Sequence, residues 1–384
     1  MFLLSRLIQG FTSASLAISL YVMIVEEFDD NELGSALGIV SSAGYVGMLI
    51  APSFMGFVIY LLNWELAFLI LIPIIAILLI LLNKIDYEWI TEKRSIDNKG
   101  SLIYILLMVL FSYGMTTLDD IGVIFLVICL ILLVIFIKVE RSVPEPISNF
   151  KLVRNIKYVI GNYAAMATYF TTTITITALS LHLQYVLDIE EYIVGMVLII
   201  APIIMIGMSG FSGRLSNRID PRIISGVAMM FLCISSIIFF FLDFIPFNLI
   251  LVACALQGAG NGLFSAPNNK YVLTLVEERD LPDASSVLST SKEFGKILSA
   301  GIFTLILAVF IGNNDMGPEH LDPLLIQSTN VMMFICILVT FSATVLLFYS
   351  KYKYGHDPNE EVVRFFKSIA PKWVKKRMRD QFED

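Results

Sequence analysis

Long apolar stretches recur along almost the whole of this 384-residue chain and decide what it can fold into. A helix rises 1.5 Å per residue, so about 20 apolar residues are enough to cross a hydrocarbon layer of roughly 30 Å. The stretches lack the alternation of polar and apolar residues that a membrane barrel needs. The sequence therefore predicts an all-α polytopic membrane protein. Eleven stretches can be read, at residues 3–25, 35–61, 65–82, 101–118, 121–137, 158–186, 193–212, 223–242, 246–270, 285–311 and 326–350.

The composition agrees with a membrane location. Hydrophobic residues make up 57% of the chain, charged residues make up 15%, and the mean hydropathy is +0.80, which a soluble chain of this length does not reach. The net charge of −7 is a property of the loops, so we expect no nucleic-acid partner. No metal or cofactor is expected either, because the cysteines lie singly in apolar segments, at Cys129, Cys233, Cys254 and Cys336.

Lysine and arginine predict how the segments are oriented, because basic loops stay on the cytoplasmic side of a membrane. If residues 26–34 lie inside, the inward loops and the tail 351–384 hold 22 of the 26 basic residues. The outward turns then hold none and carry acids such as Asp119 and Glu190. We therefore expect a multi-pass plasma-membrane protein with a cytoplasmic C-terminus. The tail is basic and amphipathic, as is typical of a helix on the inner leaflet.

An internal repeat relates the two ends of the chain. When the sequence is compared with itself at a shift of 248 residues, the apolar segments coincide. Five pairs of identical residues then align, namely Gln9 and Gln257, Gly10 and Gly258, Leu33 and Leu281, Ala36 and Ala284, and Gly47 and Gly295. Parallel repeats of this kind are one way in which secondary transporters are built. The three segments between residues 158 and 242 then have counterparts before Met1. We therefore expect about eleven helices of a 14-helix architecture.

Four motifs resemble those of the major facilitator superfamily, and within it the 14-helix drug:proton antiporters. "RLIQG" at 6–10 is similar to R-x-x-Q-G of the fourth helix, and "GYVGMLIAPSFMG" at 44–56 to the antiporter signature of the fifth. "GRLSNRIDPR" at 213–222 resembles the second copy of the loop motif G-x-L-x-D-R-x-G-R-R, and Trp64 with Phe68 resembles the start of the sixth helix. Departures from these motifs are Ala51, Met55, Glu65 and Asn217.

The resemblance implies a major facilitator fold and a monomeric transporter that works by alternating access. The bilayer, protons and a small organic solute would be its partners. Four parts are expected: residues 1–82 as the remainder of the N-terminal bundle, 83–157 as a central linker with an extra transmembrane hairpin, 158–350 as the C-terminal six-helix bundle, and 351–384 as a cytoplasmic tail.

Arg6, Gln9 and Gly10 form the first candidate site. An arginine inside a membrane helix costs at least about 2.5 kcal/mol, so it must face a wet cavity or a partner. The resemblance places it in the central cavity, where its charge would favour release of a proton from an acidic partner. The alternative is that Arg6 reaches the outer interface from the end of its helix.

The second candidate is an antiporter motif and hinge at Gly44, Gly47, Ala51, Pro52 and Gly56. Small residues let another helix approach closely, and a proline removes a backbone donor and bends the helix. The resemblance implies that this interface seals the outward side. Ordinary packing of small residues is the alternative.

Gly213, Arg214 and Arg218 are expected in a short inward turn after a helix. The two arginines would pair with helix ends and acids of a neighbouring helix and hold an inward gate shut in one state. The alternative is a solvated basic loop.

Lys292, Glu293 and Lys296 lie one turn apart on a segment that should line the central cavity. Lys292 and Lys296 share a face, and Glu293 can pair with Lys296. Glu293 is then the residue expected to bind and release the proton that is coupled to transport. A near-surface cluster of ions is the alternative.

The chain lacks the sequence signatures of nucleotide binding and hydrolysis, so an ion gradient is the expected energy source and no enzyme is predicted. The resemblance favours proton-coupled efflux of small amphipathic or drug-like organic solutes. Two alternatives remain open, namely an exporter or importer of a specific native metabolite, and a truncated fragment that does not transport.

Overall fold

The computed structural model describes residues 2–61, 69, 71–84, 97–117, 120–143, 150–312 and 318–354, and these ranges contain helices and no strand. The helices are α1 (Phe2–Glu27), α2 (Asp30–Leu61), α4 (Leu71–Leu82), α5 (Asn98–Thr117), α6 (Asp120–Glu140), α7 (Phe150–Arg154), α8 (Ile156–Leu181), α9 (Glu191–Leu215), α10 (Pro221–Phe240), α11 (Phe247–Leu273), α12 (Leu281–Phe310) and α13 (Pro318–Tyr354). A π-helical turn, His182–Val186, continues α8, and a 3-10 turn, Glu278–Asp280, precedes α12.

Ten of these helices are long and apolar enough to cross a membrane. They coincide with ten of the eleven predicted stretches, so the predicted all-α membrane fold is confirmed. The remaining stretch, 65–82, is described as the shorter apolar helix α4. The predicted amphipathic tail beyond Tyr354 and the motif residues Trp64, Glu65 and Phe68 lie outside the described residues.

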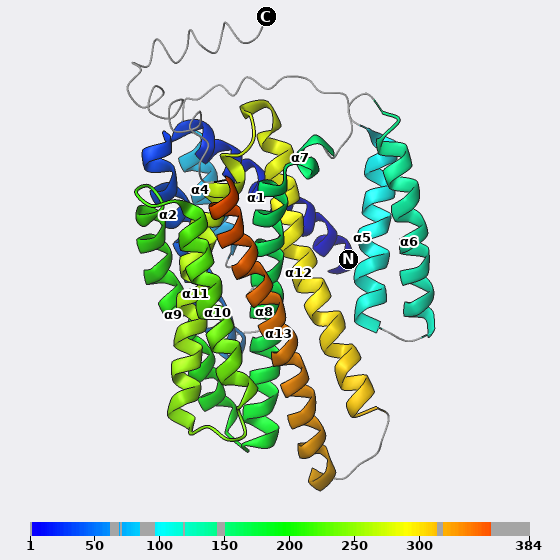
Figure 1. Ribbon diagram of the computed structural model, residues 1–384, viewed down its shortest axis with the longest axis vertical. Coiled ribbons are helices and arrows are strands. Elements are labelled where there is room, and N and C mark those ends of the chain that lie inside the picture. Colours follow the sequence, from blue (N-terminus) through cyan, green and yellow to red (C-terminus); the bar gives the residue numbers. More distant parts are fainter. Residues whose placement is uncertain are drawn as a thin grey trace, which may run out of the picture.

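Helices α8 to α13 pack around two buried apolar clusters. In both clusters, side chains of α8 and α11 meet side chains of α10 and α13. Small residues permit close packing there. A Cβ on Gly260 of α11 would lie 2.7 Å from Leu232 of α10, and a Cβ on Gly226 of α10 would lie 2.9 Å from Phe348 of α13. Figure 1 shows these helices side by side along the long axis of the molecule.

The hairpin of α5 and α6 lies at one side of this group and contacts it through α12 (Figure 1). The rings of Phe111 and Phe294 stack with centroids 4.7 Å apart. The hydroxyl of Tyr104 donates a hydrogen bond to Thr290 Oγ1 over 3.2 Å. The additional hairpin predicted between residues 83 and 157 is therefore present as two long helices.

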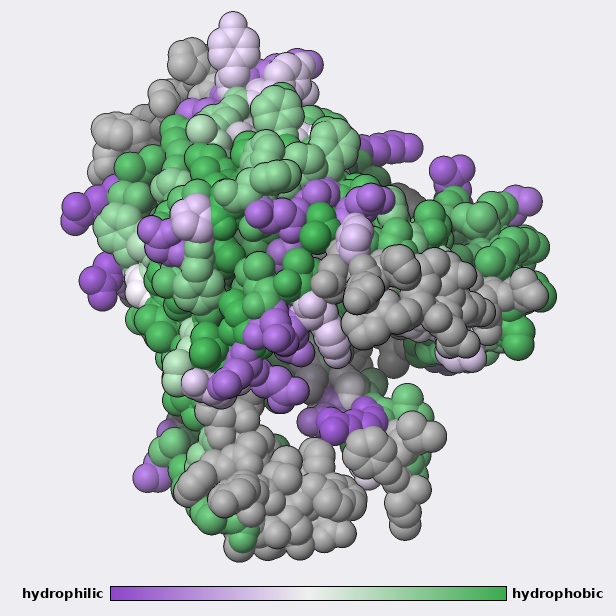
Figure 2. Space-filling model, turned by 90° about the horizontal axis from the view of Figure 1, so that it is seen from below, coloured by the Kyte–Doolittle hydropathy of each residue, from purple (hydrophilic) through white to green (hydrophobic). Residues whose placement is uncertain are grey.

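The helices begin and end at two distinct ends of the molecule. We call the basic end the one that contains the α1–α2, α9–α10 and α11–α12 connections and the last residues of α13, at the top of Figure 1. Its exposed side chains include Arg214 and Arg218. Figure 2 views the opposite end, which is mostly hydrophobic with polar side chains scattered over it. Two exposed acids lie where α9 begins at that end, Glu190 just before the helix and Glu191 as its first residue.

Asp220 joins the start of α10 to the end of α13 at the basic end. Its side chain accepts a hydrogen bond from the backbone N–H of Arg222, 2.9 Å away, and so caps α10. Its Oδ2 also lies 2.8 Å from Arg222 Nη2 and 2.8 Å from Lys351 Nζ. Burial alone would raise the pKa of Asp220, but the hydrogen bonds from Arg222 and Lys351 outweigh it and lower the pKa to about 2.

We expect Asp220→Asn to lower the melting temperature of the purified protein at pH 7 but not near pH 2. Because the pKa is depressed in the folded state, ionised Asp220 stabilises the fold above the unfolded value of 3.8, and this contribution is lost as the pH falls through about 2. The difference corresponds to about 2 kcal/mol at neutral pH. Melting curves of both proteins between pH 2 and 7 measure it. A gap that stays constant over this range would show that the carboxylate charge is not the cause.

Candidate functional site

The closest contact between the start of the chain and its C-terminal helices is the crossing of α2 and α9 at the basic end. A Cβ on Gly38 would lie 2.9 Å from the carbonyl oxygen of Ser209 and 3.0 Å from Gly213 Cα. A Cβ on Gly213 would meet the carbonyl oxygen of Gly34 and would lie 2.7 Å from Gly38 Cα. Glycine at these positions lets the two backbones touch without intervening side chains.

Asn217 and Lys270 hold this crossing from the side of α9 and α11. Asn217 Oδ1 accepts hydrogen bonds from Gly34 N–H and from Lys270 Nζ, both over 2.9 Å. Asn217 Nδ2 donates to Ser35 Oγ, also over 2.9 Å. Lys270 Nζ donates in addition to the backbone carbonyls of Asp30 and Ser216. One ammonium group thus joins the first turn of α2 to the end of α9, and we call Gly34, Gly38, Gly213, Asn217 and Lys270 the basic-end seal.

Serine side chains continue the contact toward the middle of the molecule. Ser209 Oγ donates to the carbonyl of Gly38 over 3.3 Å, and Ser42 Oγ donates to the carbonyl of Ile206 over 3.0 Å. Ser41 Oγ lies 3.1 Å from Ser265 Oγ of α11. Polar contacts of α2 therefore extend over about two turns, from Gly34 to Ser42.

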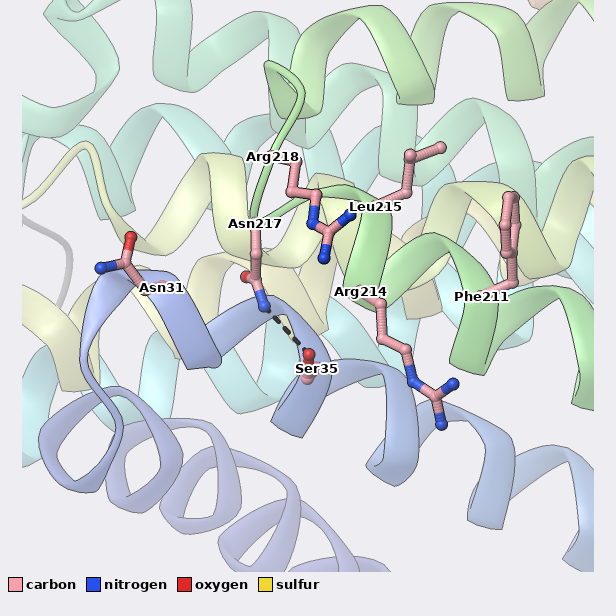
Figure 3. A pocket seen from close by; sticks show the side chains of 7 residues that line it. All are labelled: Asn31, Ser35, Phe211, Arg214, Leu215, Asn217 and Arg218. Carbon is pink, nitrogen blue, oxygen red and sulfur yellow. Dashed lines mark hydrogen bonds between the residues drawn. The ribbon is translucent and has the colours of Figure 1, made fainter.

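A recess of about 610 Å³ lies beside the seal. Its lining residues are Asn31, Ser35, Phe211, Arg214, Leu215, Asn217 and Arg218 (Figure 3). Figure 3 shows the Arg214 side chain extending alongside α2 and the Arg218 side chain between Asn217 and Leu215. Both arginines are exposed. Within the described ranges no acid lies at ion-pair distance from either of them, so the predicted pairing of these arginines stays a prediction.

The structure corrects the predicted position of Gly213. The sequence motif suggested a turn after a helix, but α9 continues through Leu215, so Gly213 and Arg214 belong to its last turn. Gly213 is buried against Gly34 and Gly38 of α2. This contact lies within the last turn of α9, and the chain turns only after it. The motif therefore contributes to the seal through its glycine and Asn217.

A second group of polar side chains lies between α1 and the C-terminal helices. Lys292 of α12 is 7% exposed and donates hydrogen bonds to Asn269 Oδ1 over 3.0 Å and to the Tyr21 hydroxyl over 3.2 Å. Asn269 Nδ2 also donates to the Tyr21 hydroxyl, over 3.3 Å. Lys292 Nζ lies 4.9 Å from the centre of the Tyr21 ring and 5.9 Å from that of Tyr169 on α8. We call Tyr21, Tyr169, Asn269 and Lys292 the central cluster.

The predicted pair of Lys296 and Glu293 is confirmed. Lys296 Nζ lies 2.7 Å from Glu293 Oε1, and the two side chains are 42% and 64% exposed. Lys296 Nζ also lies 5.3 Å from the centre of the Tyr169 ring. This pair is therefore next to the central cluster, and the Tyr169 ring has two ammonium groups within 6 Å of its centre.

Arg6, Gln9 and Gly10 lie on an exposed face of α1. Arg6 Nη1 donates to Gln9 Oε1 over 2.9 Å, so two of the three predicted residues contact each other. A Cβ on Gly10 would meet no described atom within 4 Å. The described residues do not bring these three side chains to the central cluster, and their role in a cavity stays a prediction.

Among the described residues, the first two glycines of the antiporter motif have no close helix contact, so their predicted role stays a prediction. A Cβ on Gly44 or Gly47 would meet no described atom within 4 Å, and both residues, like Ala51, are exposed. Pro52 and Gly56 belong to α2, but their surroundings lie outside the described part of the structure. The close approach on α2 occurs instead at Gly34 and Gly38, because α9 crosses this helix at its basic end.

Seven residues of the two groups were absent from the predicted site, namely Tyr21, Gly34, Gly38, Tyr169, Asn217, Asn269 and Lys270. Two signals in the sequence point to three of them, Tyr21, Asn269 and Lys270. Lys270 is one of four basic residues in or at the ends of the apolar stretches. Tyr21 and Asn269 are 248 residues apart, which is the repeat distance, and equivalent positions of two repeats can meet only close to the axis that relates the repeats.

Comparison with known proteins agrees with this architecture. The sequence profile of the Major Facilitator Superfamily matches residues 1–145 and 161–380. The riboflavin transporter RibZ of Clostridioides difficile is 25% identical over 350 residues, which are 89% of this chain and 75% of RibZ. The uncharacterized transporter YebQ of Escherichia coli is 25% identical over 322 residues, 82% of this chain and 70% of YebQ.

The drug efflux pump JefA of Mycobacterium tuberculosis is also 25% identical, over 340 residues that are 84% of this chain and 66% of JefA. Each of these relatives is named as a transporter or a pump. The match to the family profile covers most of the chain, and it coincides with ten membrane-crossing helices. The chain therefore belongs to the Major Facilitator Superfamily, a family of membrane transporters of small solutes.

Proposed function

We propose that this protein exports a small organic solute by alternating access, in exchange for protons. The basic end faces the cytoplasm in this proposal, because basic loops are retained on that side. Residues 1–82 and 158–350 then form the two bundles that move against each other. The solute binds at the central cluster, and the basic-end seal closes the pathway beneath it.

The observation that supports this best is the position of Lys292. It is a buried ammonium group in the middle of a membrane helix, and its hydrogen bonds reach α1 on one side and α11 on the other. Buried ions in membrane helices mark transport pathways, because their energetic cost is retained only where function needs it. The group also lies where two parts of the chain far apart in sequence meet, as a transport site between two bundles requires.

Two solute classes are compatible with the relatives. JefA is named as a drug efflux pump, which favours export of drug-like amphipathic solutes. RibZ is named as a riboflavin transporter, which favours a specific native metabolite as the second candidate. A test expresses the chain in cells that lack their main efflux pumps and compares retention of dyes and of riboflavin with and without a protonophore. Retention that neither expression nor the protonophore changes would contradict proton-coupled export.

Glu293 is the proposed proton-binding residue. Glu293→Gln cannot be deprotonated, so we expect proteoliposomes with this variant to lose accumulation driven by a pH gradient while exchange of solute for solute persists. A gradient of one pH unit can drive up to about tenfold accumulation of the solute inside the proteoliposomes. We expect the variant to show no accumulation in response to this gradient. Glu191→Gln, at an exposed position of the opposite end, is the control. If the Glu293 variant still responds to the gradient as the control does, another group carries the proton.

A further inference from the structure

We infer that the solute bound at the central cluster is an aromatic anion, that is, a planar ring system with a carboxylate, sulfonate or phosphate group. This inference rests on the proposed transport through that cluster. It concerns the chemical class of the solute, which neither the fold nor the family determines.

Among the described residues, none supplies a negative charge to Lys292. Its described contacts are the Tyr21 hydroxyl, the Asn269 side-chain carbonyl and two aromatic rings, all of them uncharged. No carboxylate of the described residues lies within ion-pair distance of it. A buried ion is stabilised best by an opposite charge with good hydrogen-bond geometry. A bound anion would supply that charge.

The net charge around the cluster is positive. When five residues are left out at each end of each helix, the membrane-crossing helices of the described ranges carry three charged residues, Lys292, Glu293 and Lys296. Glu293 lies 2.7 Å from Lys296 and is satisfied by it. The remaining net charge is positive and lies at Lys292. A cationic solute at this place would be repelled, whereas an anionic one would be attracted.

The aromatic part of the solute follows from the two tyrosine rings. Two ammonium groups lie near the Tyr169 ring, with Lys296 Nζ at 5.3 Å and Lys292 Nζ at 5.9 Å from its centre. The Tyr21 ring centre is 4.9 Å from Lys292 Nζ. A planar solute can pack against such rings while its anionic group takes the hydrogen bonds that Lys292 now donates to Tyr21 and Asn269. The cluster therefore offers one cationic contact and two aromatic contacts within a single site.

The test uses two dyes that share the xanthene ring but differ in charge, 5-carboxyfluorescein as the anion and rhodamine 123 as the cation. Fluorescence anisotropy measures the binding of each dye to the purified full chain in detergent, without any ion gradient. The proteins are the wild type, Lys292→Gln, Lys292→Arg and Lys138→Gln. Lys138 is an exposed lysine in the last turn of α6 and serves as the matched control. The melting temperature of each variant checks that it is folded.

We expect the wild type and the Lys138 variant to bind 5-carboxyfluorescein at least about tenfold more tightly than rhodamine 123. Lys292→Gln should weaken binding of the anion by roughly tenfold to a hundredfold and leave binding of the cation unchanged or stronger, while Lys292→Arg keeps the preference. A wild type that prefers rhodamine 123, that binds neither dye, or that loses both dyes equally with Lys292→Gln overturns the inference.

Transport measurements separate this inference from the proposed function. Uptake of both dyes into proteoliposomes without a charge preference leaves the transport proposal standing and overturns the inference. Selective binding of the anion without uptake of either dye supports the inference about the site and contradicts transport through it.

Discussion

Replacing Gly213 by alanine should reduce transport by roughly a hundredfold, because the basic-end seal can no longer close. The new Cβ would meet the carbonyl oxygen of Gly34 and would lie 2.7 Å from Gly38 Cα. Both are backbone atoms, so α2 and α9 must move apart rather than rearrange a side chain. Overpacking of this kind costs about 1–3 kcal/mol, and each 1.4 kcal/mol shifts the equilibrium between closed and open states about tenfold.

Gly210 provides the matched control one turn away on the same helix. A Cβ on Gly210 would meet only Ser42 Oγ, at 3.6 Å, which is an ordinary contact. Both variants should reach the membrane in wild-type amounts, because each substitution alters only the contact between α9 and α2. Initial rates of dye transport in vesicles, normalised to the amount of protein, measure the effect. Equal rates for Gly213→Ala and Gly210→Ala would show that the crossing does not close during transport.

Lys270→Met is expected to open the basic end. The substitution keeps the approximate volume but removes the ammonium group that donates to Asp30, Ser216 and Asn217. Hydrogen bonds from a charged group contribute about 1.5–3 kcal/mol each, and part of this is recovered when the freed carbonyls meet water. We expect the open state to gain roughly tenfold to thirtyfold in population and gradient-driven transport to fall.

Cysteine labelling measures this opening directly. Ser41 lies inside the crossing, where its hydroxyl contacts Ser265, and the four native cysteines are buried. With Ser41→Cys as reporter, a membrane-impermeant maleimide should react faster in vesicles that expose the basic end when Lys270→Met is present. Lys351→Met, which removes a lysine of the Asp220 network outside the seal, is the control. Equal labelling rates in the two backgrounds would mean that Lys270 does not keep the seal closed.

Some contacts of the predicted site residues could be derived from the sequence and others could not, for reasons that differ between residues. The pair of Glu293 and Lys296 follows from spacing along one helix, so the sequence was sufficient to predict it. Lys292 was selected as a charged residue in the middle of an apolar stretch, but its partners were not predicted. Tyr21 and Asn269 lie on two other helices, and the contact depends on how those helices are rotated about their axes.

The glycines show the same distinction. Gly44 and Gly47 were selected because they belong to a family motif, yet the backbone contact occurs at Gly34 and Gly38. All four residues are glycines of the same helix, α2. Only the position at which α9 crosses α2 decides which of them must remain small.

By itself, the sequence determined the all-helical membrane architecture and the place of nearly every crossing, because transfer of a helix into lipid depends only on the residues of that segment. The tertiary structure alone decided that Lys270, Asn217 and Gly34 form one seal, although they are spread over more than 200 residues. The physical reason is that lipid is as apolar as the helix surfaces. Helices therefore choose their partners through backbone fit and a few polar contacts, and these exist only once the crossing is made.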